Sequence, residues 1–277
     1  MSKYFELMQQ TELKSDFASF DVPDLAPPPK SHSDTIPKSH SDSVPKSYSD
    51  DVAPKSVPAA APLHSRWADS LAREEFVKLV QNTFLLPASQ SPRVVVFAGI
   101  DPGSGCSVNC ALVAEILASQ NVGSVCLVDA NLRKPALPQL FGVTNHFGLT
   151  EALSNSGPIR GFAKTLGPEN LWLLSCGSFG HDSPNLLNSD ATKARIAELR
   201  SEFDYVLIDS PPLNAFSDAI VLACLADGLV LVIEAHATRR EAAARVADNL
   251  RSAQIKVLGA VLNKRTFPIP EYLYHRL

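Results

Sequence analysis

The stretch Val94–Val108 reads V-V-V-F-A-G-I-D-P-G-S-G-C-S-V, and it sets the frame for the segments on either side. The β-branched and apolar run Val94–Ala98 predicts a buried strand. Proline and glycines then predict a loop at 102–105, and the apolar periodicity of 106–118 predicts a helix. When strand, glycine loop and helix follow in this order, the backbone N–H groups of the loop and the positive end of the helix dipole face the same anion. We therefore expect a phosphate-binding loop here.

One position in this loop departs from the usual pattern. A phosphate-binding loop normally carries Lys directly before Ser or Thr, where its ammonium reaches the β- and γ-phosphates. Here that position is Cys106, before Ser107. A thiol at a helix N-terminus is expected to have a lowered pKa and some reactivity, but we favour the alternative that Cys106 fills the base of the loop while backbone amides bind nucleotide. The residues expected around the phosphates are Asp101, Pro102, Gly103, Ser104, Gly105, Cys106, Ser107 and Val108.

Further apolar runs predict the rest of a sheet. Strands are expected at 124–129, 171–175, 205–209, 229–233 and 257–262, and helices at 67–84, 185–201 and 239–251. Apolar strands without alternation, separated by helices, indicate a parallel sheet covered on both faces. The fold class expected for residues 66–277 is therefore a doubly wound, mostly parallel α/β domain of the P-loop, Rossmann-like type. Its ligand site should lie at the carboxyl ends of the strands.

The composition is that of an ordinary globular protein. The 277 residues are 45% apolar with a formal net charge of −4, which fits one large domain or two small ones and gives no reason to expect nucleic acid. Five cysteines, an odd number in mostly apolar contexts, predict free thiols in a cytoplasmic protein. No signal peptide is predicted, and charges interrupt the most apolar run, 219–237, which predicts helix, turn and strand rather than a membrane span.

The N-terminal 1–65 has a different composition. It is rich in Pro, Ser, Asp and Lys, and P-K-S-H-S-D occurs at 29–34 and 37–42 before P-K-S-Y-S-D at 45–50. Such a segment buries too little apolar surface to offset the entropy of ordering. We expect a disordered arm that acts as a spacer, with a tether or phosphorylated segment as the alternative.

Polar residues follow several of the predicted strands. Asp129 and Asp209 end two of them, and Asn263 ends the last. An acid at the end of such a strand is the usual ligand for Mg²⁺ in a P-loop protein. The alternative is that each acid caps a helix or closes a turn, and Ser-Pro-Pro after Asp209 forms a turn in any case. Because the loop and both acids occur in the expected order at strand ends, a nucleotide site is favoured.

Five phrases together resemble one family. These are D-P-G-S-G-C-S, V-D-A-N-L-R-K-P, F-G-V-T-N-H-F-G-L-T-E-A-L, F-D-Y-V-L-I-D-S-P-P and V-L-G-A-V-L-N-K-R. They resemble the bacterial tyrosine kinases of capsule and exopolysaccharide production, P-loop proteins related to the chromosome-partition and septum-positioning ATPases. The resemblance extends from about residue 72 to the C-terminus. It implies transfer of the γ-phosphoryl of ATP to tyrosine with Mg²⁺, by a cytoplasmic protein that a membrane-bound polysaccharide co-polymerase recruits and activates, with homo-oligomers possible.

The resemblance also implies a role for each matching residue. Amides of Gly103–Ser107 would hold phosphates. The Ser107 hydroxyl and the carboxylates of Asp129 and Asp209 would hold Mg²⁺, Asp209 directly or through a water, and Asp129 would also act near the incoming tyrosine hydroxyl. Arg133 would lie near the γ-phosphate or at a subunit contact, and Asn263 would contact the adenine edge. The acceptor tyrosines expected are Tyr272 and Tyr274, with Tyr4 and Tyr48 as alternatives.

Several departures from the family pattern leave alternatives open. Cys106 removes one preorganised charge, which commonly costs about 10²–10³ in rate, and Asn131 stands where many members have a second acid. Arg133 and Lys134 are the two cations that could replace the charge of the missing loop lysine. The oligomerisation frame holds Glu75, Lys78 and Gln81, which weakens the expected ring contacts. A non-catalytic nucleotide-binding regulator with the same partners is the alternative function, and a positioning ATPase is a weaker one.

Overall fold

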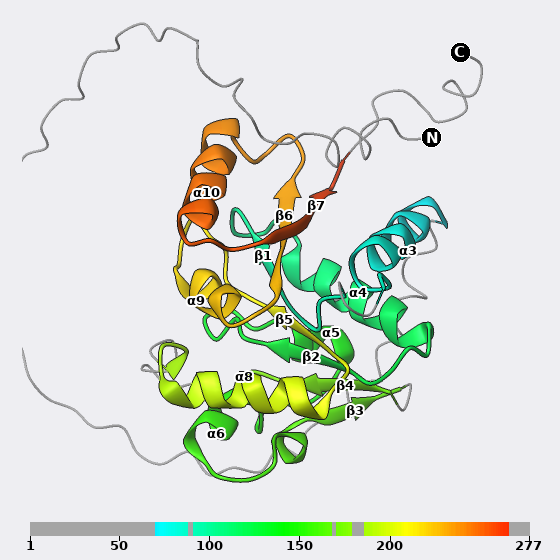
Figure 1. Ribbon diagram of the computed structural model, residues 1–277, viewed down its shortest axis with the longest axis vertical. Coiled ribbons are helices and arrows are strands. Elements are labelled where there is room, and N and C mark those ends of the chain that lie inside the picture. The colour runs from blue at the N-terminus through cyan, green and yellow to red at the C-terminus, as the bar shows by residue number, and fades with distance from the viewer. Residues whose placement is uncertain (1–69, 88–90, 168–169, 179–185, 266–277) are drawn as a thin grey trace, which may run out of the picture. The chain divides into compact units, whose positions relative to one another are not determined.

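The computed structural model describes residues 70–87, 91–167, 170–178 and 186–265 (Figure 1). In this part of the chain a seven-stranded sheet has the order β3-β4-β2-β5-β1-β6-β7. Neighbouring strands are parallel except β3 and β4, which are antiparallel. The strands are β1 (Val94–Gly99), β2 (Val125–Asp129), β3 (Lys164–Leu166), β4 (Leu171–Leu174), β5 (Tyr205–Asp209), β6 (Gly228–Glu234) and β7 (Val257–Asn263).

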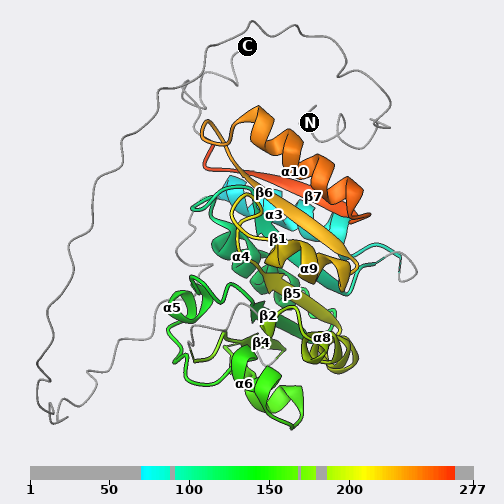
Figure 2. The ribbon, with the colours of Figure 1, turned by 90° about the vertical axis from the view of Figure 1, so that its left-hand side faces the viewer.

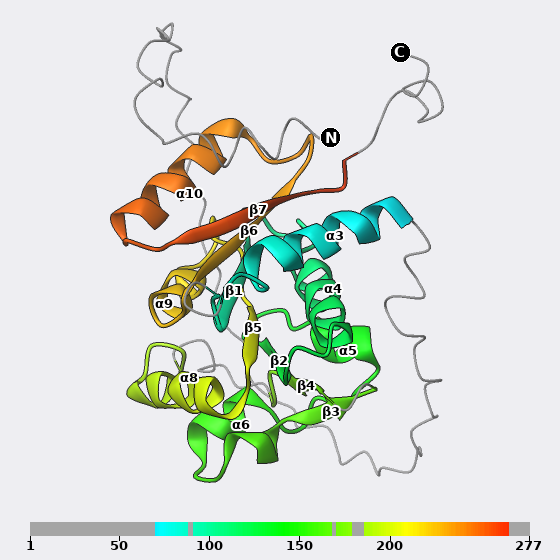
Figure 3. The same cartoon turned by 45° about the vertical axis from the view of Figure 1, so that its right-hand side comes forward.

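Helices cover both faces of this sheet. Figure 2 shows α8, α9 and α10 in front of the strands, with α3 and α4 behind them. Figure 3 shows α3 beside α4 and next to β7. The helices are α3 (Ser70–Thr83), α4 (Cys106–Ser119), α5 (Leu137–Phe141), α6 (Leu149–Ser154), α8 (Asp190–Glu202), α9 (Asp218–Cys224) and α10 (Arg240–Ser252), and Ile159–Phe162 forms one 3₁₀ turn, η1.

Strand β1 lies at the centre of both hydrophobic cores, because its side chains alternate between the two faces. Val94, Val96 and Ala98 pack with α8, α9 and α10, whereas Val95 and Phe97 pack with α3 and α4. All six residues of β1 are buried. Burial of each large apolar side chain stabilises the fold by about 1.5–3 kcal/mol, so β1 anchors the loop that follows it. That loop emerges between the ends of β5 and β6.

The predicted doubly wound α/β fold is confirmed, with differences in detail. Helix α8 begins at Asp190 rather than 185, because the Ser189 hydroxyl caps it by accepting from the Thr192 amide at 3.3 Å. The short elements α5, α6, η1 and β3 carry too few residues for periodicity to predict them. The arm expected at 1–65 and the four candidate acceptor tyrosines lie outside the described residues. Within those residues, no helix is both long and apolar enough to cross a membrane.

Candidate nucleotide-binding site

The loop after β1 has the backbone of an anion cradle. Gly103 and Gly105 both have φ of +86°, a left-handed conformation that favours glycine. A Cβ at Gly105 would also lie only 2.3 Å from Nδ2 of Asn263, so this glycine is required for space as well. Helix α4 starts directly afterwards, its first backbone bond running from the Asn109 N–H to the Gly105 carbonyl at 3.1 Å.

The first amides of α4 are open. Within the described residues, no protein acceptor takes the backbone N–H groups of Gly105, Cys106, Ser107 and Val108. The first N–H groups of any helix lack partners inside the helix, and here the helix dipole adds a partial positive charge. Of the amides expected to hold phosphates, those of Gly105–Ser107 are open, whereas the Ser104 amide donates to the Asp101 carbonyl at 3.3 Å. The open amides can accept an anionic group, and binding of phosphates there stays a prediction.

Asp209 supplies an independent sign of a ligand at the same place. The residue is fully buried, and among the residues that the structure describes neither carboxylate oxygen has a hydrogen-bond partner. Burial raises the pKa of Asp209 to about 6, against the opposing influence of the neighbouring Ser107 hydroxyl and Cys106 thiol. A buried carboxylate without a partner is costly, so this position suits a cation. The carboxylate and the Ser107 hydroxyl are both oxygen ligands of the kind that Mg²⁺ takes.

Asp129 stands opposite Asp209 in the pairing of β2 with β5. Its Oδ1 accepts from the Asn131 amide at 3.2 Å, and its Oδ2 accepts from the Ala136 and Leu137 amides at 3.1 Å each. Burial and the charge of Asp209 raise its pKa to about 8, although the three amides act in the other direction. Asp129 thus holds the start of α5, as the capping alternative predicted, and it also lies beside the carboxylate expected to bind metal.

Three side chains fasten the loop to other strand ends. Asn214, after β5, donates from Nδ2 to Asp101 Oδ1 at 2.7 Å. Asn263 donates from Nδ2 to the Ser104 carbonyl at 2.8 Å, and Lys264 donates from Nζ to the Gly103 carbonyl at 2.7 Å. The predicted juxtaposition of the loop, Asp129, Asp209 and Asn263 is therefore present, while contact of Asn263 with adenine stays a prediction.

Arg133 is engaged elsewhere in this structure. Its Nε lies 3.0 Å from Oδ2 of the buried Asp218, and its guanidinium stacks 4.0 Å from the centre of the Phe216 ring. These partners belong to the start of α9 and the segment before it. Arg133 therefore ties the region after β2 to the region after β5, and a role near the γ-phosphate or at a subunit contact stays a prediction.

Cys106 does not have the lowered pKa expected of a reactive thiol at a helix N-terminus. Burial of its thiol, together with the charge of Asp209, raises its pKa well above the ordinary value. A helix N-terminus alone would lower the pKa, but here burial, followed by the charge of Asp209, raises it. The thiol of Cys106 is therefore neutral at ordinary pH, which favours a filling role over a reactive one, and binding of nucleotide by the amides around it stays a prediction. All five cysteines are free thiols.

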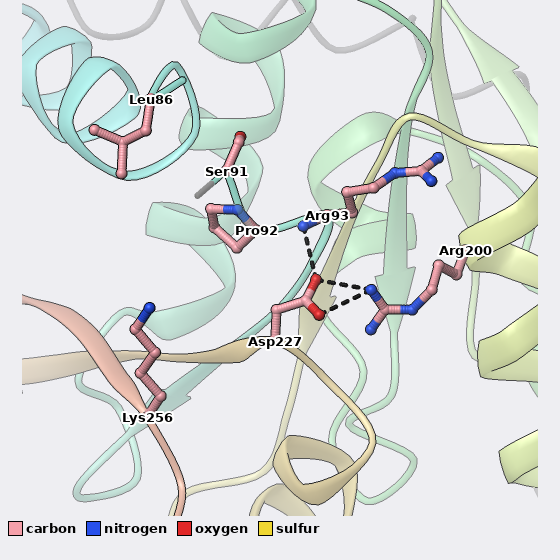
Figure 4. A pocket seen from close by; sticks show the side chains of 7 residues that line it. All are labelled: Leu86, Ser91, Pro92, Arg93, Arg200, Asp227 and Lys256. Carbon is pink, nitrogen blue, oxygen red and sulfur yellow. Dashed lines mark hydrogen bonds and ion pairs between the residues drawn. The ribbon is translucent and has the colours of Figure 1, made fainter. Parts of the chain in front are cut away.

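A second hollow lies at the opposite edge of the sheet. It has a volume of about 450 Å³, and Leu86, Ser91, Pro92, Arg93, Arg200, Asp227 and Lys256 line it (Figure 4). Asp227 binds Arg200 at 2.8 Å and accepts from the Arg93 and Val94 amides at 2.7 and 2.8 Å. The ion pair and hydrogen bonds of Asp227 connect β1, α8 and the start of β6. We therefore infer that the residues of this hollow stabilise the fold.

Sequence reasoning did not find three residues of the site. Asn214 and Lys264 hold the loop, and Asp218 holds Arg133. Asn214 and Asp218 follow the strand that ends at Asp209, and Lys264 follows Asn263. The signal available was this position just after a strand end, where side chains of parallel strands converge.

Proteins similar to this chain in sequence and structure include tyrosine kinases and a polysaccharide transport protein. The tyrosine-protein kinase YwqD of Bacillus subtilis is 31% identical over 207 residues, which are 74% of this chain and 87% of YwqD. The succinoglycan biosynthesis transport protein ExoP of Rhizobium meliloti is 32% identical over 210 residues, 72% of this chain but 26% of ExoP. The solved BceF tyrosine kinase domain has a TM-score of 0.63 at 27% identity, over 73% of this chain and 81% of that domain. No protein-family model matches the chain.

Proposed function

This chain belongs to the family of bacterial tyrosine-protein kinases, and we propose that it binds ATP with Mg²⁺ at the loop after β1 and transfers the γ-phosphoryl group to tyrosine. One observation carries the proposal. The buried carboxylate of Asp209, which accepts no hydrogen bond within the described part of the chain, lies beside the hydroxyl of Ser107 and a row of open amides. A site for a cation next to a site for an anion fits a magnesium–nucleotide complex.

Each group of the site then has a role. The amides of Gly105–Val108 would bind phosphate oxygens, and Ser107 with Asp209 would hold the metal. When bound, Mg²⁺ supplies positive charge that offsets the charge of the phosphates. Asn263 would contact the adenine, and Arg133 would approach the γ-phosphate on leaving Asp218.

Asp129 would receive the proton of the acceptor hydroxyl. In the transfer, a bond forms between the tyrosine oxygen and the γ-phosphorus, the bond from that phosphorus to ADP breaks, and the hydroxyl proton leaves. Oδ1 of Asp129 has a single amide donor, so this atom has room for a proton. Burial and the charge of Asp209 raise the pKa of Asp129, and bound Mg²⁺ would offset that charge, so the carboxylate would be ionised and able to take up the proton.

The alternative function is a nucleotide-binding regulator with little transfer activity. Cys106 favours it, because a neutral thiol stands where a lysine would stabilise the transferring phosphate. The cradle of amides would still bind nucleotide. Both functions share the same ligand and differ in turnover.

We propose that the protein acts at the inner face of the membrane in exopolysaccharide production. ExoP supports this, because the matching region forms only 26% of that transport protein, and a separate membrane co-polymerase could supply the remainder to a shorter kinase. The chain itself would be cytoplasmic and recruited through this partner, and Tyr272 and Tyr274 would be self-acceptors, ahead of Tyr4 and Tyr48. Assembly with further copies of the chain is also expected.

Incubation with γ-labelled ATP and Mg²⁺ tests the function. We expect phosphotyrosine on the wild-type chain, its loss in Asp129→Asn, and loss of magnesium-dependent ATP binding in Asp209→Asn. ATP binding without phosphotyrosine would support the regulator, and absence of ATP binding at millimolar concentration would contradict both functions. The matched control is Asp227→Asn, which changes a carboxylate at the opposite edge of the sheet.

A further inference from the structure

Two consecutive residues at the end of β7 hold the phosphate loop from outside. Asn263 donates a hydrogen bond to the Ser104 carbonyl at 2.8 Å, and the Lys264 ammonium donates one to the Gly103 carbonyl at 2.7 Å. The backbone of Lys264 is left-handed, with φ of +56°. A residue other than glycine adopts this conformation at a cost, so other interactions must hold the turn that follows β7.

Glu234, the last residue of β6, binds the same ammonium. Its Oε1 lies 3.0 Å from Nζ of Lys264, and its own backbone N–H donates to Oγ1 of Thr238 at 3.3 Å. The side chain of Lys264 is 49% exposed, yet its charge is shared between this carboxylate and the loop carbonyl. Hydrogen bonds from a charged donor are stronger than those between neutral groups, so the contact fixes the loop more firmly than a neutral amide would.

These bonds determine where the loop amides point. In a planar trans peptide, the carbonyl and the N–H point to opposite sides. With the Gly103 carbonyl held by Lys264, the Ser104 N–H points to the other side, where it meets the Asp101 carbonyl at 3.3 Å. With the Ser104 carbonyl held by Asn263, the N–H of Gly105 points away from β7. That N–H is the first of the open amides.

Lys264 also brings a positive charge to the loop. Arg133 is bound to Asp218 and Phe216. Lys134 is exposed, and its backbone N–H donates to Asn131. Of the three cations, Lys264 is the one with a bond to the loop backbone, in a loop where Cys106 replaces the usual lysine.

We propose that Lys264 is a positioning residue, which holds the phosphate loop in its anion-binding conformation and supplies from outside part of the charge that Cys106 lacks. The statement about charge rests on the proposed function, because it concerns nucleotide affinity. The statement about loop conformation does not, because it can be tested without nucleotide.

Amide hydrogen exchange of the full chain without nucleotide tests the conformation. The bonded amides of Ser104 and Asn109, which donate to the Asp101 and Gly105 carbonyls, report on the loop. Lys264→Ala should speed their exchange by about tenfold, the effect of losing one charged hydrogen bond, and Lys264→Arg should restore the wild-type rate. The matched control is Lys256→Ala, which removes the same charge before β7 at the opposite edge of the sheet and should leave the loop unchanged. An unchanged rate in Lys264→Ala would overturn the positioning role, whether or not the protein binds ATP.

Titration calorimetry with Mg²⁺ and ATP tests whether the charge of Lys264 contributes to nucleotide affinity. Lys264→Ala should weaken affinity about tenfold, and the loss should be smaller when Cys106→Lys restores a cation inside the loop, because the two charges are coupled. An equal loss in both backgrounds would overturn the compensation. No heat from the wild-type chain would contradict the proposed function instead, and the exchange rates would then decide the role of Lys264.

Discussion

At the scale of single residues, the buried pair Asp129 and Asp209 controls what the site can hold. Both carboxylates are fully buried, and they face each other across β2 and β5. The amides around Asp129 compensate part of its burial, whereas Asp209 has no such partner. Without a cation the pair is therefore most stable when it keeps protons.

This pair predicts a pH dependence of stability. The pKa of Asp129 is raised from 3.8 to about 8 and that of Asp209 to about 6. Between pH 3.8 and about 8 the folded protein keeps protons that the unfolded chain has released, so the free energy of unfolding should fall as pH rises across this window. Urea unfolding at a series of pH values, without Mg²⁺, measures it. Asp209→Asn should flatten the curve, and a wild-type free energy that rises from pH 5 to about 8 would contradict the assignment.

The substitution Cys106→Lys should increase the rate of phosphoryl transfer. A lysine there would place a fixed positive charge at the transferring phosphate, and one such stabiliser is worth about 10²–10³ in rate. Single-turnover transfer from labelled ATP measures the gain, with Cys224→Lys, an exposed position on α9, as the control for added charge. If turnover does not increase, the site lacks more than this charge.

At the scale of elements, the unit of β1, loop and α4 presents the amides. The strand is fixed by burial on both faces, and the helix begins at Cys106 with Gly105 as its N-cap in a left-handed conformation. Ile100 is buried in the core, but residues 101–105 after it have no large aliphatic or aromatic side chain to pack. Its shape therefore depends on two glycines and on bonds from other strand ends.

The two glycines should respond differently to alanine. Both have φ of +86°, so either substitution should cost about 1–2 kcal/mol of backbone strain. A Cβ at Gly103 meets nothing within 4 Å, whereas one at Gly105 would displace Asn263. Gly105→Ala should therefore lower nucleotide affinity more than Gly103→Ala, as titration calorimetry would show. Equal affinities would mean that Asn263 does not shape the loop.

At the scale of the whole molecule, one acid links several elements at the edge of the sheet where the strands begin, opposite the phosphate loop. Asp227 precedes β6, binds Arg200 of α8 and accepts from two amides at the start of β1. Burial acts to raise its pKa, but the Val94 and Arg93 amides and Arg200 hold the pKa below its ordinary value. The edge away from the phosphate loop is thus a region of structural bonds.

The substitution Asp227→Asn should lower the stability of the fold without changing nucleotide affinity. Loss of the charged acceptor should lower the free energy of unfolding by about 2 kcal/mol, as measured by urea unfolding at neutral pH. Because the depressed pKa keeps Asp227 ionised in the folded state, the difference should shrink as the pH falls below 3.8. Nucleotide affinity should not change, and a large loss of affinity would contradict the division between the two edges.

The sequence predicted most of the fold because its signals are local. The strands β1 and β5 and the helix α4 agree with their expected positions, since apolar runs and glycines specify them within a few neighbours. The antiparallel β3 and the first turns before α8 were not predicted. The first is only three residues long, and in the second a serine cap, rather than periodicity, sets the helix start.

By itself, the sequence determined the phosphate loop, the two acids at strand ends and the missing lysine, because each is a choice of residue type beside a recognisable element. Only the tertiary structure decided that three amides hold Asp129, that Asp209 accepts no hydrogen bond from the described residues, and that Lys264 reaches Gly103. Lys264 and Gly103 are 161 positions apart in the chain. No local pattern encodes such a pair, which exists because parallel strands bring their carboxyl ends to one edge of the sheet.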